Sequence, residues 1–450
     1  MTTEKFKVES ALDFIIDSVL IISERSNREY NIGAVVSEID LFEHIDKPYI
    51  TGKILFVDNA RVIERLNLSG TEKVSVKIKI EEEDQSVLTI EKNFYIDEIV
   101  KSMKTNDDTE VVGISIIEDI AYISQLSRIS KSFRGTTSGI IQRVVEDYLD
   151  REFFNLSNKE YTEPFPIRVV VPNMTPLNTI NWIKDRASTN NGMPFFLFST
   201  ICDDRIRYLD LETMISLNPL NVSTREYSYV QGVPNNADAS DKILQSYTIN
   251  SYNFTSNENQ LYLARKGAIS STYNFIDTMT NTTLTRKINA DEMFNRIRFS
   301  PIQNEPTYDS KSTFNELTMH EYNTTEISQI SPTVTYDDNT FNYYESKDVN
   351  THMHKAESRA LRHFLHKSAI DINVPGRNFL YKDINKSIGN VIRISFKANE
   401  VSLEENDATN NRDKKKSGNY FIYAARHVFQ ANQYTVNLSC TKLAHEKGVG

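Results

Sequence analysis

The stretch KNFYIDEIVKSMKTNDDTEVVGISI, residues 92–116, has a counterpart near the other end of the chain, GNYFIYAARHVFQANQYTVNLSC, residues 418–440. After one residue, each reads Asn, two aromatic residues and Ile, and then crosses a polar break into alternating apolar residues. A Gly and a β-branched strand precede both copies, at Gly70 and Gly389. This shared order predicts that one β-unit occurs twice in the chain. The alternative is that any two antiparallel hairpins look alike to this degree.

The strand ahead of each copy carries the clearest apolar pattern. In KVSVKIKI, Val and Ile alternate with Ser and Lys, which is the period-two pattern of a half-buried strand. NVIRISF carries a similar β-branched pattern ahead of the second copy. We take these two strands as candidates for the wall of a ring, with their polar faces lining its lumen or meeting the next ring. The residues concerned are Val74, Val76, Ile78, Ile80, Val391, Ile392, Ile394 and Phe396.

Residues 1–125 read mostly as short strands, including LDFIIDSVLIIS at 12–23, AVVSEIDLFEHI at 34–45 and YITGKILFVD at 49–58. One or two helical turns are expected at 60–66. Short strands at this spacing favour a small antiparallel barrel or sandwich. We therefore expect 1–125 to form a first β-barrel, called here a tube domain.

The middle of the chain changes character. Residues 138–154 place apolar side chains at i, i+1, i+4 and i+5 from Ile140 onward, which is a helical stripe. Thr175 and Pro176 read as the N-cap and first residue of a second helix, after a strand at 167–171. We expect an α+β domain made of 126–240 together with 271–368.

The C-terminal part returns to strands. KILQSYTINSYNF at 242–254 and LYLARKGAI at 261–269 read as strands, and a third helix is expected at 352–370. Only strands follow that helix, whereas residues 270–350 read as irregular, with short strands and long loops. We expect 241–270 and 369–450 to form a second barrel. The predicted fold class is mixed β and α+β, with two similar antiparallel β-barrels and an interleaved α+β domain.

Composition limits the function classes. The 450 residues include 51 basic and 61 acidic side chains, a formal net charge of −10. Tight non-specific binding of a phosphate backbone needs clustered Lys and Arg, so nucleic acid is expected to pass rather than be held. Two cysteines, Cys202 and Cys440, exclude a disulfide framework. No signal peptide and no membrane span are expected.

Motifs for catalysis and metal binding are weak. The sequence has no phosphate-binding loop, no dinucleotide fingerprint and no nucleophile elbow. Four histidines, His352, His354, His363 and His366, could suit Zn2+, but a polar helix face explains them as well. Residues 414–416 are three lysines directly after an Asp, more typical of a solvated loop than of a nucleic-acid site. We therefore expect no enzyme activity, no cofactor and no metal.

The sequence as a whole resembles a known family. Residues 44–80, the helix around 140–149, the segment TINWIKDRASTNNGMPFFLFST and the C-terminal block from ESRALRHFLHKSAI onward are similar to the central baseplate hub protein of T-even-type contractile-tailed bacteriophages. The plan is also similar to the hub portions of VgrG spikes and late-control-D tail proteins. The resemblance rests on the order of elements along most of the chain, not on signature residues.

The resemblance implies a structural function. It implies a homotrimer in which two similar units per chain make six, so that a ring adapts a threefold central spike to a sixfold tail tube while DNA passes through. The partners expected are the chain itself, a spike protein, a tail-tube or tube-initiator protein and other baseplate proteins. The expected place is the virion tail baseplate, assembled in the host cytoplasm. The alternatives are a tail-associated cell-wall hydrolase and a receptor-binding β-protein.

Overall fold

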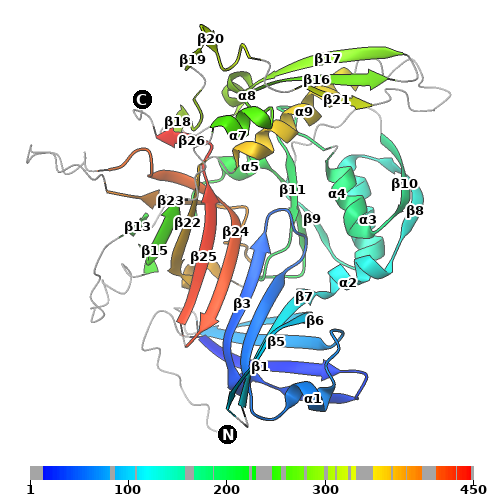
Figure 1. The fold of residues 1–450 in the computed structure, drawn as a ribbon, viewed down its shortest axis with the longest axis vertical. Helices are drawn as coiled ribbons and strands as arrows, with labels where there is room; N and C mark the ends of the chain where they lie inside the picture. The colour runs from blue at the N-terminus through cyan, green and yellow to red at the C-terminus, as the bar shows by residue number, and fades with distance from the viewer. Residues whose placement is uncertain are drawn as a thin grey trace, which may run out of the picture.

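The computed structural model describes most of the chain and shows it to be mostly β, with helices grouped between the strands (Figure 1). The described residues are 14–81, 87–106, 109–157, 167–185, 187–221, 225–229, 246–254, 260–277, 281–297, 303–309, 312–322, 326–330, 348–365, 368–381, 383–397, 412–431 and 433–446.

The N-terminal part is an antiparallel sheet whose alternate side chains face one core. Its elements are β1 (Phe14–Ser23), β2 (Arg28–Asn31), η1 (Gly33–Val35), β3 (Val36–His44), β4 (Thr51–Asp58), α1 (Val62–Leu66), β5 (Lys73–Glu81), β6 (Val87–Asn106) and β7 (Thr109–Glu118). The short helix α1 begins where the Asp58 carboxylate accepts hydrogen bonds from the backbone N–H groups of Val62 and Ile63. The predicted strands and helical turn of this part are confirmed.

The middle part packs helices against small sheets around a core of its own. Its elements are α2 (Asp119–Leu126), β8 (Ile129–Gly135), α3 (Thr137–Leu149), β9 (Phe153–Asn155), β10 (Ile167–Met174), α4 (Pro176–Lys184), β11 (Phe195–Phe198), β12 (Ile206–Asp210) and α5 (Leu211–Ser216). Thr136 and Thr175 cap α3 and α4 by accepting from the N–H groups of Gly139 and Asn178. The predicted stripe of α3 is buried, and its core lies within residues 120–208.

The remaining elements form the second half of the large sheet and a group of short elements beside it. They are β13 (Tyr227–Tyr229), β14 (Thr248–Ile249), β15 (Ser251–Phe254), α7 (Gln260–Arg265), β16 (Ser270–Asp277), β17 (Thr282–Asn289), α8 (Ala290–Arg296), β18 (Gln303–Pro306), β19 (Thr313–Phe314), β20 (Leu317–Thr318), β21 (Glu326–Ile330), α9 (Asp348–Phe364), β22 (Ala369–Pro375), η2 (Gly376–Phe379), β23 (Val391–Ser395), β24 (Gly418–Gln430), β25 (Gln433–Thr441) and β26 (Ala444–Glu446).

The two ends of the chain meet in one sheet. β24 pairs with β3 in antiparallel register, so the C-terminal strands lie beside the N-terminal ones (Figure 1). An unbroken antiparallel path therefore runs β15-β22-β25-β24-β3-β4-β7-β6. The buried apolar residues of both halves belong to one continuous core.

The same four-stranded order occurs twice in this large sheet. β4-β7-β6-β5 and β22-β25-β24-β23 match in strand direction, and the two copies agree in register as far as their first bulge. Ile96 faces Ile116 in the first copy, and Ile422 faces Cys440 at the same place in the second. One residue further on, a β-bulge interrupts each ladder. Gly70 and Gly389, both with positive φ, precede the equivalent strands β5 and β23.

Residues 261–269 were expected to be a strand, but α7 begins at Gln260, and its Leu263 is buried while Leu261 is exposed, as on a helix with one apolar side. In the region 270–350, expected to be irregular with short strands and long loops, β16 and β17 form a regular antiparallel pair. The closure of each half into a barrel stays a prediction, since the strands form a large mixed sheet with several small ones.

Candidate assembly interface

The two strands predicted as ring walls lie inside the large sheet. β5 pairs with β1 and β6, and β23 pairs with β24 and β13. All eight predicted side chains are buried: Val74, Val76, Ile78, Ile80, Val391, Ile392, Ile394 and Phe396. These side chains therefore stabilise the fold of one chain. Only the intervening polar residues, such as Ser75 and Arg393, are placed to meet a lumen or a neighbour, and the ring-wall role stays a prediction.

The strongest candidate feature is the joint between the two halves, defined here as the β24–β3 ladder from Ala424 opposite His44 to Gln430 opposite Glu38. Sequence reasoning missed this joint, because strand pairing between distant segments leaves no local periodicity. The only hint was acidic residues placed within an apolar strand at 36–44.

The first polar contact of the joint is an Arg–carboxylate pair. Arg426 donates from Nε to Asp40 Oδ1 at 3.0 Å and from Nη2 to Asp40 Oδ2 at 2.7 Å. Two parallel bonds of this kind fix geometry as well as charge. The hydrogen bond to Asp40 is the main reason that the pKa of Arg426 is raised above its usual value. The pair therefore pins the register of β24 on β3.

The second polar contact of the joint is fully buried. His427 Nε2 lies 3.4 Å from Glu43 Oε2, and neither side chain is exposed to solvent. His427 Nδ1 is 2.8 Å from the hydroxyl of Tyr434, and Glu43 Oε1 accepts from the N–H of Ile201 at 2.6 Å. Burial raises the pKa of Glu43, but the charge of His427 and the hydrogen bonds outweigh burial and lower it. Glu43 thus links both halves of the sheet to the middle part.

Two further charge clusters fasten the middle part to the sheet. Lys92 on β6 binds Asp204 at 2.5 Å and lies 3.3 Å from Glu118 on β7. Burial lowers the pKa of Lys92, yet these carboxylates outweigh burial and raise it. Asp46, after β3, contacts Lys184 of α4 at 2.9 Å and Arg362 of α9 at 3.2 Å. In these clusters the charged groups bind one another, so we assign them a structural role in holding the middle part against the sheet.

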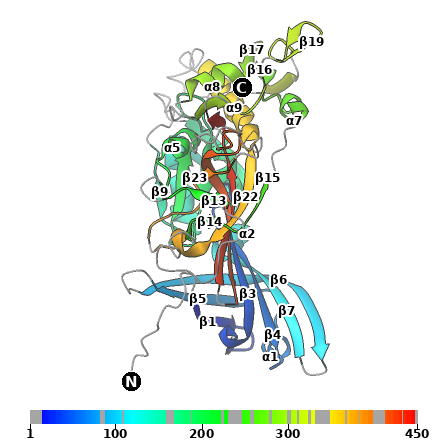
Figure 2. The same cartoon turned by 90° about the vertical axis from the view of Figure 1, so that its left-hand side faces the viewer.

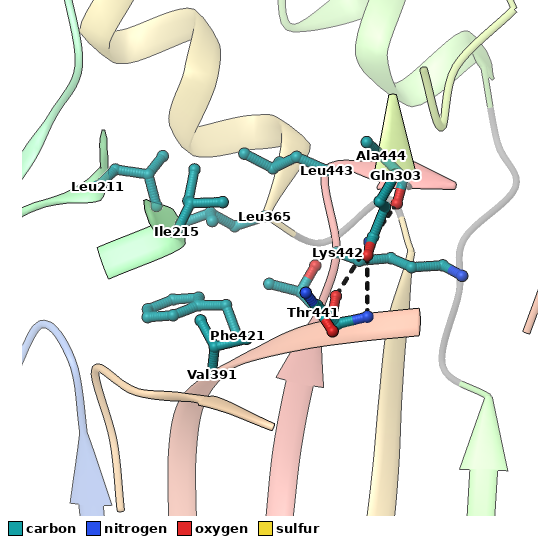
Figure 3. A pocket seen from close by; sticks show the side chains of 11 residues that line it. Leu211, Ile215, Gln303, Leu365, Val391, Phe421, Thr441, Lys442, Leu443 and Ala444 are labelled. Atoms are coloured by element: carbon teal, nitrogen blue, oxygen red, sulfur yellow. Dashed lines mark hydrogen bonds between the residues drawn. The ribbon is translucent and has the colours of Figure 1, made fainter. Parts of the chain in front are cut away.

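One small cavity lies where β23, β24 and β26 meet α5 and α9 (Figure 3). Its volume is about 30 Å³, room for a few water molecules. Gln303 seals one side by donating to the carbonyls of Asn419 and Ala444. The ammonium of Lys442 points away from the cavity (Figure 3) and donates to the Ser417 carbonyl at 2.8 Å. The cavity is too small for a substrate.

Of the four histidines predicted as possible Zn2+ ligands, His363 is the one whose side chain the structure describes. His363 lies on α9 with its ring 6.1 Å from that of Tyr262, whereas the side chains of His352 and His354 and the whole of His366 lie outside the described residues. Within the described part of the chain, His, Cys, Asp and Glu form no group of three or more suited to a metal ion. Among the helices that the structure describes, none is long and apolar enough to cross a membrane.

Comparison with known proteins gives a clear structural result and no sequence match. No family model and no curated protein matches the chain. The tail protein from Neisseria meningitidis MC58 is similar with a TM-score of 0.50 at 11% identity, covering 96% of this chain and 97% of that one. The 43 kDa tail protein of prophage MuSo2 from Shewanella oneidensis has a TM-score of 0.51 at 8% identity, covering 94% and 98%.

A PdpA–VgrG complex from Francisella is also similar, with a TM-score of 0.42 at 10% identity over 97% of this chain and 59% of that chain. The structures with TM-scores of 0.50 and 0.51 show that the chain shares the fold of these two tail proteins. The resemblance expected from the sequence is confirmed at the level of the fold.

Proposed function

We propose that this chain is a structural hub of a contractile-tail baseplate, and that three copies form a ring around the tail axis. The fold shared with phage tail proteins along nearly the whole chain supports a structural tail role. The observation that carries the proposal is the repeated four-stranded unit, joined edge to edge within one chain. Three chains with two such units each present six similar units.

Six similar units on three chains reconcile two symmetries. Such a ring has true threefold and approximate sixfold symmetry, so one face suits a threefold spike and the other a sixfold tube. In this proposal, each half closes into a barrel-like tube domain, about 1–125 and 241–270 with 369–450, and the α+β domain of 126–240 with 271–368 braces them. DNA passes through the lumen, because a chain of net charge −10 does not hold phosphates tightly.

Measurement of mass and shape tests the proposal. Light scattering on the purified full chain should give three times the 51.8 kDa of one chain. Negative-stain micrographs should show rings with six similar lobes. A monomer at all concentrations, alone and with a spike protein added, would contradict the proposal. Clearing of peptidoglycan would favour the hydrolase alternative instead, and binding to a glycan array would favour the receptor-binding one.

A further inference from the structure

The β24–β3 joint within the chain suggests how two chains could pair, because each chain contains the repeated unit twice. After its bulge, β24 leaves β23 behind, and its residues from Ala424 to Gln430 pair with β3. β3 flanks the other repeat, as the outer neighbour of β4. The far end of the long strand β24 of one repeat therefore pairs with β3, the strand that flanks β4 of the other repeat.

The corresponding two edges are unoccupied within the described chain. β5 covers β6 only as far as Tyr95, and beyond that residue β6 pairs with β7 alone among the described strands. In the second repeat, β15 occupies the place of β3, because it is the outer neighbour of β22. Among the described residues, β15 pairs only with β22. Among the described strands, β15 therefore has a neighbour on one side only, and so does the far part of β6.

The β6 edge has the composition of a contact surface. Ile99, Val100 and Met103 are exposed by 39%, 49% and 56%. The hairpin of β6 and β7 extends away from the rest of the molecule (Figure 2). A long open strand edge with apolar side chains is a template for pairing with another chain, and proteins normally cover such an edge. On β15, Tyr252 is also 39% exposed.

We propose that the far end of β6 in one copy pairs antiparallel with β15 of a second copy, repeating between chains the β24–β3 joint found within each chain. The proposal rests on the proposed ring and names its contact. The partner is a second copy because the receiving edge that matches β3 by position, β15, belongs to this same chain.

The repeat also fixes the register of this contact. Met103 faces Val111 on β7 as Val428 faces Thr435 on β25, and these two partners occupy equivalent positions when counted from the common bulge along β7 and β25. β6 carries one extra residue over this stretch, because a second bulge lies between Ile99 and Lys101. On the receiving side, Asn253 faces Asp371 as Asp40 faces Lys53. Since Val428 lies opposite Asp40 in the chain, Met103 lies opposite Asn253 of the neighbouring copy. The next pair along is Lys104 with Tyr252.

The contact is of the head-to-tail type. The donating edge and the receiving edge are different surfaces of one chain, so each copy donates to one neighbour and receives from the other. Contacts of this type either close into a ring or grow into a filament. Each joint, within a chain or between chains, then links the far end of the long strand of one repeat to the strand that flanks the next repeat. Six similar units in one closed ring require this arrangement.

Disulfide cross-linking tests the register directly. Two double variants of the full chain, Met103→Cys with Asn253→Cys and Lys104→Cys with Tyr252→Cys, place thiols at directly opposed positions. One of the two pairs is non-hydrogen-bonded and brings its side chains closer. The native thiols interfere little, because Cys440 is buried and burial raises the pKa of Cys202 to about 11. Oxidation should give covalent dimers and trimers on a non-reducing gel and nothing larger.

The control is the slipped pair, Met103→Cys with Tyr252→Cys, because a shift by one residue sends side chains to opposite faces of the sheet. It should cross-link at least tenfold more slowly. Mixing the single variants Met103→Cys and Asn253→Cys should give dimers only, since each chain then carries one introduced thiol. Trimers in solution without cross-links at either opposed pair would overturn the contact and leave the ring standing. A protein that stays monomeric would overturn both.

Discussion

The guanidinium of Arg426 on β24 binds both carboxylate oxygens of Asp40 on β3, across 386 positions of sequence. This pair joins the two repeats at the centre of the antiparallel path. Asp40 is 8% exposed, whereas Arg426 is 42% exposed and partly screened by water. The pair therefore orients the two halves more than it stabilises them.

A double-mutant cycle on Arg426→Ala and Asp40→Asn should measure that contribution. We expect a coupling free energy of about 0.5–1 kcal/mol, the size usual for a partly exposed ion pair with good geometry. Urea unfolding of the four proteins provides the values. The exposed pair Lys73 with Glu24 is the matched control and should give almost no coupling. If the coupling free energy of Arg426 with Asp40 does not exceed that of the control pair, the interpretation that Arg426 fixes the register of β24 on β3 is wrong.

The buried Glu43 should give the protein a characteristic acid sensitivity. Its pKa is lower in the folded chain than the ordinary value of 4.5, so the unfolded chain binds the proton first as the pH falls. Stability from this group is present above pH 4.5 and is lost as the pH falls through the folded-state pKa. Glu43→Gln should flatten the decline in the free energy of unfolding below pH 4.5.

The control for this prediction is Glu64→Gln, which changes an exposed carboxyl on α1. Denaturant titrations at half-unit pH steps from 7 to 3 compare the three proteins. If the wild type and Glu43→Gln decline in parallel, protonation of Glu43 does not account for the loss of stability in acid.

The comparison of sequence with structure separates local from distant information. Alternation placed Val74, Val76 and Ile78 correctly in the core, and capping chemistry placed the start of α4 at Pro176. Local pattern failed at 261–269, where a short apolar run fits a helix and a strand equally. The pairing of β24 with β3 could not be predicted from the sequence. A period-two pattern indicates which face of a strand is buried, but it does not indicate which strand lies beside it.

The repeat was the exception to this limit. Two segments with the same order of residues implied the same order of strands, and the structure shows an equally placed first bulge in both. The polar residues of the joint, Asp40, Glu43, Arg426 and His427, had no such signal. Each is ordinary in its own strand and acquires a role only from the strand opposite.

Removal of the Lys92 charge should strongly destabilise the chain. Lys92 and Glu118 are 4% and 7% exposed, so Lys92→Met leaves a buried carboxylate without its cation. Breaking a buried pair in this way typically costs about 3–5 kcal/mol. The double variant Lys92→Met with Glu118→Gln should recover most of the loss, because the neutral amide still accepts from the N–H of Ile50. Equal loss in both variants would show that Lys92 acts by packing alone.

Lys442 should make stability rise with pH on the alkaline side of neutrality. Burial lowers its pKa to about 7, although the carboxylates of Glu446 and Asp413 oppose the shift. Between pH 7 and the ordinary value of 10.5, the unfolded chain therefore binds more protons than the folded chain, and folding is favoured as the pH rises. Lys442→Met should remove this rise. Urea unfolding between pH 7 and 9 measures it, below the range in which tyrosines titrate. Lys287→Met, on an exposed position of β17, should keep the rise, and a rise of equal size in Lys442→Met would assign it to another group.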